Sequence, residues 1–215
     1  MYKYEILNKL NANGIVAIIR KIDKGKLDGI LNALIEGGIR CVEVTADTDG
    51  AFEFIRNMTA KYGEKLCIGA GTILDPETCR MAIIAGAQYI VTPTLNIDVI
   101  KTANRYGKHA IPGAMTPTEI LTAYENGAEI VKVFPAGSLG PSYFKEVLGP
   151  LSHIPLMATG GITINNVFEF KKVGIKLFGI GSALLDREAI KASDFNKIKD
   201  IARKFVIALA NDISS

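Results

Sequence analysis

The chain lacks several features that would place it in common classes of protein. No stretch approaches the ~20 apolar residues that a membrane-spanning helix needs, so we expect no membrane partner. Three cysteines, Cys41, Cys67 and Cys79, are an odd number without CxxC spacing, which indicates a reducing cytoplasm rather than a disulfide framework. Residues 1–14 carry charges among their apolar positions and predict a short amphipathic helix instead of a signal peptide.

Short motifs of other enzyme classes are also missing. The sequence has no GxGxxG, GxSxG or Walker-type loop. His109 and His153 have no cysteine or carboxylate partner at ligand spacing, so we expect neither a metal nor a cofactor. The net charge is only +3, and the densest basic group falls in a predicted amphipathic helix near the C-terminus. This favours a solvated helix face over nucleic-acid binding, and a mild positive balance suits a small anionic substrate.

The chain does contain a regular succession of short apolar runs and helical segments. The helical segments begin with a capping residue before proline, as at Asp75 and Thr116, and end at glycine, as at Gly86 and Gly127. Eight runs predict strands over residues 14–20, 41–45, 66–72, 89–93, 109–112, 129–135, 155–159 and 177–182. We therefore expect an α/β fold, a single (β/α)8 TIM barrel domain over residues 1–215 with an extra N-terminal helix. An open doubly wound sheet is the alternative.

Lys132 interrupts the sixth apolar run, with apolar neighbours on both sides. Burial disfavours an ammonium ion, so such a lysine either pairs with a carboxylate or gives up its charge. A neutral amine attacks carbonyl carbon and forms a Schiff base. Lys132 thus indicates either covalent catalysis or a structural ion pair.

Glu43 interrupts the second run in the same way. Alternation with a period of two puts Glu43 on the face of Cys41 and Thr45, and Lys132 on the face of Ile130. A buried carboxyl with a raised pKa can move protons beside an imine-forming lysine. The alternative is that Glu43 and Lys132 only neutralise each other.

Alternation and glycine content indicate further candidates at the C-terminal ends of the runs, where barrel enzymes perform their chemistry. Arginine is suited to bind a carboxylate or phosphate, so Arg20 is a candidate for holding an anionic ligand. The alternative is that Arg20 is only a surface residue at the end of a strand. Glycine-rich segments at residues 69–72, 159–162 and 179–182 predict an anion site or, alternatively, simple turns. Three polar residues share a face with an apolar residue of their own run: Arg20 with Val16, Thr72 with Ala70, and Thr159 with Met157.

At these residues the chain resembles the 2-keto-3-deoxy-6-phosphogluconate / 4-hydroxy-2-oxoglutarate aldolases. The resemblance implies a class I, metal-independent aldolase on a (β/α)8 barrel, assembled as a homotrimer. Such an enzyme cleaves an anionic keto-acid sugar phosphate to pyruvate and glyceraldehyde 3-phosphate, or 4-hydroxy-2-oxoglutarate to pyruvate and glyoxylate. The matching stretches, in family order and spacing, are residues 15–20, 37–38, 42–45, 69–72, 112–113, 132–135, 159–162 and 179–182.

The resemblance also implies roles for individual residues. Lys132 matches the Schiff-base lysine and Glu43 the general acid/base. The substrate-binding positions are Arg20, Gly71 and Thr72 for the pyruvate carboxylate, Pro93 and Phe134 for the pocket walls, and Gly160, Gly161, Gly181 and Ser182 for the phosphate, to which the inward-facing Thr159 is added.

One position departs from the pattern. Many members have an arginine four residues after the glutamate, where this chain has Asp47. Residues 91–93 and 134–143 are similar to relatives that act on the galactonate epimer, so a 2-keto-3-deoxy-6-phosphogalactonate aldolase is the nearest alternative. Two other classes are a sugar-phosphate isomerase or epimerase and a non-catalytic phosphate-binding barrel.

Overall fold

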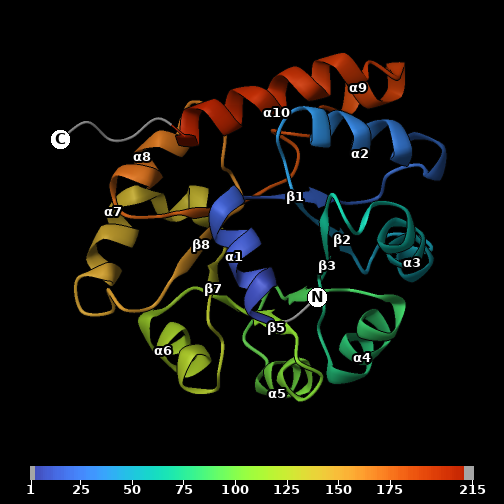
Figure 1. Cartoon of the computed structure of the whole chain (residues 1–215). Helices are drawn as coiled ribbons and strands as arrows, with labels where there is room; N and C mark the ends of the chain where they lie inside the picture. Colours follow the sequence, from blue (N-terminus) through green and yellow to red (C-terminus); the bar gives the residue numbers. More distant parts are fainter. Residues whose placement is uncertain (1–2, 211–215) are drawn as a thin grey trace.

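A parallel sheet forms the centre of the computed structural model, which describes residues 3–210 (Figure 1). The strands pair in the order β5-β4-β3-β2-β1-β9-β8-β7-β6. Only Pro112 separates β5 from β6, so the two ends of this order are one continuous segment and the sheet closes as a barrel. The predicted (β/α)8 barrel is confirmed. The strands are β1 (Ile15–Ile19), β2 (Cys41–Thr45), β3 (Cys67–Gly71), β4 (Tyr89–Val91), β5 (His109–Ile111), β6 (Gly113–Ala114), β7 (Val131–Val133), β8 (Leu156–Thr159) and β9 (Leu177–Ile180).

Pro112 ends the fifth predicted strand, residues 109–112, and β6 follows it as a further short strand that was not predicted. Proline has no N–H to donate to a sheet ladder, which interrupts the regular pairing. Its carbonyl still accepts the backbone N–H of Lys132 at 2.9 Å, and Gly113 pairs with Lys132 in parallel register. The segment that closes the barrel therefore runs beside Lys132.

Helices form a ring around the barrel (Figure 1). Their starts follow the predicted caps: the Asp75 carboxylate accepts the Thr78 N–H at 2.6 Å, and Thr116 forms a capping box with Glu119. The last helix packs against α2 and α8 and completes the ring. The helices are α1 (Lys3–Asn13), α2 (Leu27–Glu36), α3 (Ala51–Tyr62), α4 (Pro76–Ala85), α5 (Ile97–Arg105), α6 (Pro117–Glu125), α7 (Ala136–Leu148), α8 (Val167–Lys172), α9 (Arg187–Ala192) and α10 (Phe195–Ala210), with a 3-10 turn at Lys24–Lys26.

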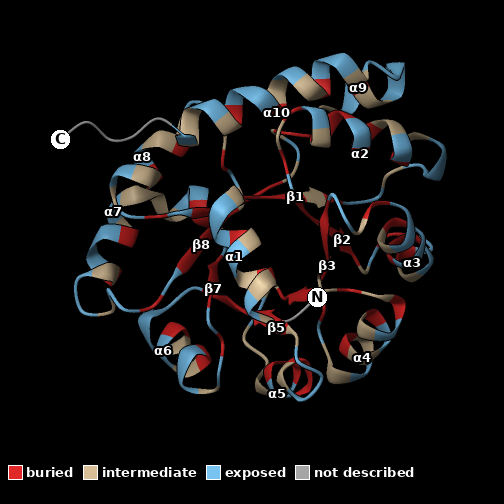
Figure 2. Cartoon of the chain, in the orientation of Figure 1, coloured by how far each residue is buried: buried red, intermediate tan, exposed pale blue. Residues whose placement is uncertain are grey.

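Alternation along the strands separates two apolar layers. One layer lies between sheet and helices and contains Val42 and Val44; the other fills the barrel. Because Glu43 alternates with Val42 and Val44, and Lys132 with Val131 and Val133, both point into the barrel, as predicted. Figure 2 shows the strands buried and the outer faces of the helices exposed. The inner layer contains Val16, Cys41, Cys67, Tyr89, Val91, Ile111, Ile130, Met157 and Leu177.

The predicted inward face of Ala70 is wrong, and with it the alternation that placed Thr72 inward. Ala70 belongs to the outer layer and Cys67 to the inner one, so the inward positions of β3 are Cys67, Gly69 and Gly71. Thr72 follows the strand with a left-handed φ of 58°, where alternation no longer applies. With two glycines in the last three residues of β3, the sequence has too few side chains there to show which face is inside.

The helix α1 lies across the N-terminal end of the barrel (Figure 1). Its Ile6 and Leu10 are buried against the inner layer. His109 Nε2 donates to the Lys3 carbonyl at 2.7 Å, and Cys41 Sγ lies 3.6 Å from the Lys9 carbonyl. The predicted N-terminal helix is confirmed over Lys3–Asn13, and residues 1–2 lie outside the described residues. Because α1 closes this end, the opposite, C-terminal end is left for a functional site.

The described residues also bear on membrane insertion, disulfides and metal binding. Within residues 3–210, no helix combines the length and apolar character needed to cross a bilayer. Cys41, Cys67 and Cys79 are buried and free. The same residues contain no group of three or more His, Cys, Asp or Glu side chains placed to hold a metal ion.

Candidate active site

All the predicted site residues lie at one rim of the barrel, because parallel strands end on the same side. Lys132 lies on β7, Glu43 on β2, and Thr159 ends β8. The others end a strand or follow one within two residues: Arg20 after β1, Gly71 and Thr72 at the end of β3, Pro93 after β4, Phe134 after β7, Gly160 and Gly161 after β8, and Gly181 and Ser182 after β9.

Lys132 is buried, with 6% of its surface exposed. Its Nζ lies 5.3 Å from the centre of the Phe134 ring, and no carboxylate of residues 3–210 forms an ion pair with it. Burial lowers the pKa of Lys132, the Glu43 carboxylate opposes this, and the charge of Arg20 lowers it further. The amine therefore gives up its proton more readily than an ordinary lysine, as a nucleophilic lysine must.

Glu43 is buried even more completely, with 2% of its surface exposed. Burial raises the pKa of Glu43, and the charge of Lys132 opposes the rise. The absence of a side chain at position 71 makes room for the carboxyl, since a Cβ there would lie 2.5 Å from Glu43 Oε1. Glu43 Oε2 has no hydrogen-bond partner in the described part of the chain. A buried oxygen without a partner costs free energy, so a polar group that enters the barrel here would be stabilised.

Lys132 and Glu43 act on each other's pKa without forming a direct ion pair between them. A structural pair would bring the amine and carboxylate within about 4 Å. Burial instead favours the neutral form of each group, an amine and a carboxylic acid. A nucleophile and a proton donor held in the same interior are the groups that carbonyl chemistry requires.

The loop after β8 presents backbone to the rim. Gly160 and Gly161 have left-handed φ values of 87° and 74°, and the Gly137 N–H at the start of α7 donates to the Gly160 carbonyl at 2.7 Å. A Cβ on Gly161 would lie 2.9 Å from the Gly137 Cα, so a side chain does not fit. Beside this loop the buried Thr159 hydroxyl has no partner among residues 3–210. Backbone amides and a free hydroxyl suit the oxygens of an anionic ligand.

Two residues at the rim have left-handed backbone although they carry side chains. Thr72 has a φ of 58° and Lys21 a φ of 51°. This conformation is strained, most of all for a β-branched residue, and such outliers cluster at functional sites. The strained backbone at Lys21 and Thr72 therefore favours a functional role for the segments that follow β1 and β3.

Arg20 lies at the rim but does not point freely into the barrel. Its side chain is 59% exposed, and its Nε and Nη2 donate to Asp47 Oδ2 at 3.0 and 2.8 Å. The predicted inward position of Arg20 is therefore only partly right. Position 47 stood out in the sequence only as a departure from the family pattern. The contact of Asp47 with Arg20 was not predicted, because it depends on loop geometry that hydrophobic periodicity does not show.

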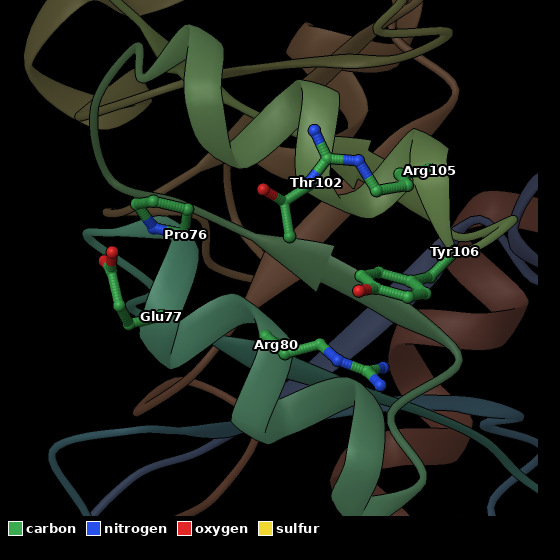
Figure 3. A pocket seen from close by; sticks show the side chains of 6 residues that line it. All are labelled: Pro76, Glu77, Arg80, Thr102, Arg105 and Tyr106. Carbon is green, nitrogen blue, oxygen red and sulfur yellow. The ribbon is translucent and has the colours of Figure 1, made fainter.

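A hollow of about 390 Å³ lies on the outer ring between α4 and α5 (Figure 3). In it the Arg80 guanidinium stacks over the Tyr106 ring at 3.9 Å. Arg80 and Arg105 point in different directions, and no lining residue belongs to the rim (Figure 3). The hollow is therefore separate from the candidate site. Its lining consists of Pro76, Glu77, Arg80, Thr102, Arg105 and Tyr106.

Known proteins match the chain over most of its length. The family model described as KDPG and KHG aldolase matches residues 6–201. The chain is 35% identical over 190 residues to 2-dehydro-3-deoxy-6-phosphogalactonate aldolase of Escherichia coli (strain K12), covering 85% of this chain and 93% of that one. It is 35% identical over 202 residues to 2-dehydro-3-deoxy-phosphogluconate aldolase of Treponema pallidum (strain Nichols), covering 94% of each.

A solved structure described as native KDPGal matches the fold with a TM-score of 0.85 at 34% identity, covering 91% of this chain and 94% of that one. The segment matched by the family model contains every strand of the barrel and both Glu43 and Lys132. The resemblance first indicated by short motifs thus extends over the whole barrel, and the chain belongs to the KDPG and KHG aldolase family.

Proposed function

We propose that the chain is a class I aldolase that cleaves 2-keto-3-deoxy-6-phosphogluconate to pyruvate and glyceraldehyde 3-phosphate through a Schiff base on Lys132. The observation that carries the proposal is a buried lysine with a lowered pKa and no ion-pair partner in the described chain, in the same interior as a buried Glu43. Family membership favours this reaction over an isomerase, an epimerase or a non-catalytic barrel.

The first half of the reaction forms the imine. The neutral Lys132 amine attacks the C2 carbonyl carbon, and the resulting carbinolamine loses its hydroxyl as water. Glu43 in its carboxylic acid form donates the proton that this departure needs. The raised pKa of Glu43 supports this role, since an acid with an ordinary pKa would already be ionised near neutral pH.

The second half breaks the carbon–carbon bond. The Glu43 carboxylate accepts the proton of the C4 hydroxyl, the C3–C4 bonding electrons move into the protonated imine, and glyceraldehyde 3-phosphate leaves. The remaining enamine takes a proton at C3 from Glu43, and water then releases pyruvate and regenerates the amine. One carboxyl thus donates and accepts in turn, and no group outside the barrel is required for the proton balance.

The two anionic ends of the substrate would be held on different parts of the rim. We assign the carboxylate to Arg20, Thr72 and Gly71, between walls formed by Pro93 and Phe134. We assign the phosphate to the loops that contain Gly160, Gly161, Gly181 and Ser182, and a substrate hydroxyl to Thr159. Fixing both ends aligns the scissile bond, an orientation effect that reaches roughly 7–11 kcal/mol at its upper range.

The same proposal covers assembly, location and domain organisation. We propose a homotrimer, supported by exposed apolar residues on α4 and just before it: Leu74, Met81 and Ile84 are each more than half exposed. The three free cysteines support a reducing cytoplasm. One continuous sheet supports a single domain over residues 1–215. Sedimentation equilibrium at micromolar concentration tests the assembly, and a monomer would contradict it.

Trapping the imine tests the chemistry. Borohydride in the presence of pyruvate should inactivate the protein and leave a reduced pyruvyl adduct, and peptide mapping should place it on Lys132. Turnover should follow with 2-keto-3-deoxy-6-phosphogluconate. An adduct on another lysine, or no adduct at all, would overturn the proposal.

The galactonate epimer is the second candidate substrate, because a relative of that name is as similar as a gluconate relative, at 35% identity each. A panel of both phosphorylated epimers and 4-hydroxy-2-oxoglutarate, compared by kcat/KM, separates the candidates. We expect the highest value with the gluconate epimer, and a tenfold preference for the galactonate epimer would reverse the assignment.

A further inference from the structure

Asp47 connects two loops of the rim. It lies between β2 and α3, and its Oδ2 accepts two hydrogen bonds from Arg20, which directly follows β1. A second contact supports the first: the backbone N–H of Lys21 donates to Thr48 Oγ1 at 3.0 Å. Thr48 Oγ1 in turn lies 3.1 Å from the buried Thr45 hydroxyl. The strained turn at Lys21 is thus held against the β2 side of the rim.

The contact with Asp47 determines toward which neighbouring strand the Arg20 side chain is held. The strand β1 lies between β2, which carries Glu43, and β9, whose loop carries Gly181 and Ser182. A long, 59%-exposed arginine at this position has the reach to turn toward either neighbour. Asp47 holds its Nε and Nη2 on the β2 side, so Nη1 is the nitrogen left for a ligand.

We infer that Asp47 is a positioning residue that anchors Arg20 on the β2 side of the rim, where its Nη1 binds the carboxylate end of the keto acid rather than the phosphate end. This inference rests on the proposed function and deepens it. Position 47, where many relatives have arginine, here fixes an arginine supplied by the neighbouring strand.

Two effects of Asp47 on an anionic substrate oppose each other. Its charge repels the substrate, and its hydrogen bonds hold Arg20 in place so that less rotamer freedom is lost on binding. The repulsion is small, because Lys21 Nζ lies 3.8 Å from the same oxygen and salt screens an exposed charge. The orientation effect therefore dominates, and removal of Asp47 should weaken carboxylate binding.

Two probes separate the two ends of the site. Pyruvate carries only the carboxylate end, and its half-saturating concentration is measured by borohydride inactivation. Inorganic phosphate carries only the other end, and it is measured as an inhibitor of cleavage. We expect Asp47→Ala to raise the half-saturating pyruvate concentration about tenfold and Asp47→Asn, which keeps one acceptor oxygen, by a smaller factor. Inhibition by phosphate should stay within about twofold of wild type.

A double-mutant cycle with Arg20→Ala shows whether Asp47 acts through Arg20. In the Arg20→Ala background, Asp47→Ala should have no further effect on pyruvate saturation. The matched control is Glu188→Gln, which removes an exposed acid paired with Lys191 on α9 and should change neither probe.

Unchanged pyruvate saturation in both Asp47 variants would overturn the inference, as would an equal effect in the Arg20→Ala background or a larger change in phosphate inhibition than in pyruvate saturation. Failure of the proposed function has a different signature. In that case wild-type protein itself shows no pyruvate-dependent inactivation by borohydride, which would contradict both the proposed function and the role of Asp47.

Discussion

The two ends of the barrel interior are built from the same strands but treat their polar groups differently. At the N-terminal end, the Tyr89 hydroxyl donates to the Val42 carbonyl at 2.6 Å, under the apolar side chains of α1. His109 Nε2 donates to the Lys3 carbonyl, and His109 Nδ1 contacts the Glu129 carboxylate. At the C-terminal end, Glu43 Oε2 and the Thr159 hydroxyl are buried without a partner in residues 3–210. The polar side chains at the first end all contact other groups of the described chain, whereas those at the second end leave polar atoms that a ligand can pair with.

This difference separates stability from activity. Buried polar groups without partners reduce stability, and proteins retain them where function needs them. Substitutions at the C-terminal end should therefore remove activity at little cost in stability, and substitutions at the N-terminal end should do the reverse.

The largest effect is expected at Lys132. Lys132→Met keeps the length of the side chain and removes the amine, so turnover should fall by roughly 10⁴-fold or more. Because a buried polar group is replaced by an apolar one, the free energy of unfolding should stay equal or rise by about 1 kcal/mol. Steady-state kinetics and urea unfolding measure the two quantities. Lys191→Met, at an exposed ion pair, is the control and should behave as wild type. Near-native cleavage by Lys132→Met would contradict the assignment of activity to the C-terminal end of the barrel.

Glu43 should come next. Glu43→Gln keeps the shape but cannot exchange a proton, so kcat should fall by about 10² to 10⁴-fold. The variant should still form some pyruvate adduct on Lys132, because the amine remains. Single-turnover trapping separates adduct formation from cleavage. A variant that cleaves substrate at the wild-type rate would assign proton transfer to another group.

Leu10 tests the N-terminal end. Leu10→Ala leaves a cavity between α1 and the inner layer, where Leu10 is fully buried, and should lower the free energy of unfolding by roughly 2–5 kcal/mol. The kcat of the folded protein should be unchanged. Leu7→Ala, at a partly buried position of the same helix, should cost less. A lower kcat with unchanged stability in Leu10→Ala would contradict the assignment of stability to the N-terminal end and of activity to the C-terminal end.

A smaller effect is expected in the pH dependence of stability. The folded pKa of Glu43 is raised above the unfolded value of about 4.3, so its contribution is fully present below that pH and is lost as pH rises through the folded pKa. Wild-type stability should therefore fall relative to Glu43→Gln above about pH 4.3, by up to about 1.4 kcal/mol for each unit of pKa shift. Urea unfolding of both proteins from pH 4.5 to 8 measures the difference. A constant difference would show that Glu43 titrates normally.

The sequence was sufficient for the barrel and for its two central residues. Glu43 and Lys132 each lie between β-branched or apolar neighbours, so alternation identified their faces. Alternation failed at Thr72, because glycines around Ala70 leave no side-chain pattern. Alternation also did not predict β6, which continues beyond Pro112, because the Pro112 carbonyl still pairs although its nitrogen cannot donate.

Contacts between loops were not predictable from the sequence at all. Arg20 and Asp47 are 27 positions apart, and their hydrogen bonds depend on how two strand exits turn. The strained φ angles of Lys21 and Thr72 belong to the same class of feature, because neither residue type favours that conformation. Local sequence propensity was therefore sufficient to predict the strands and helices, whereas the conformation of the rim loops depends on tertiary contacts.

The proposed chemistry depends above all on the protonation of a single amine, that of Lys132. Nitrogen-15 NMR of the Lys132 Nζ, followed as a function of pH in the folded protein with Lys132→Met to assign the signal, measures that protonation directly. We predict a midpoint clearly below the value of about 10.4 for a free lysine, because burial lowers the pKa of Lys132. A midpoint at or above that value would contradict the proposed chemistry, because the amine would then be charged and unable to attack a carbonyl at neutral pH.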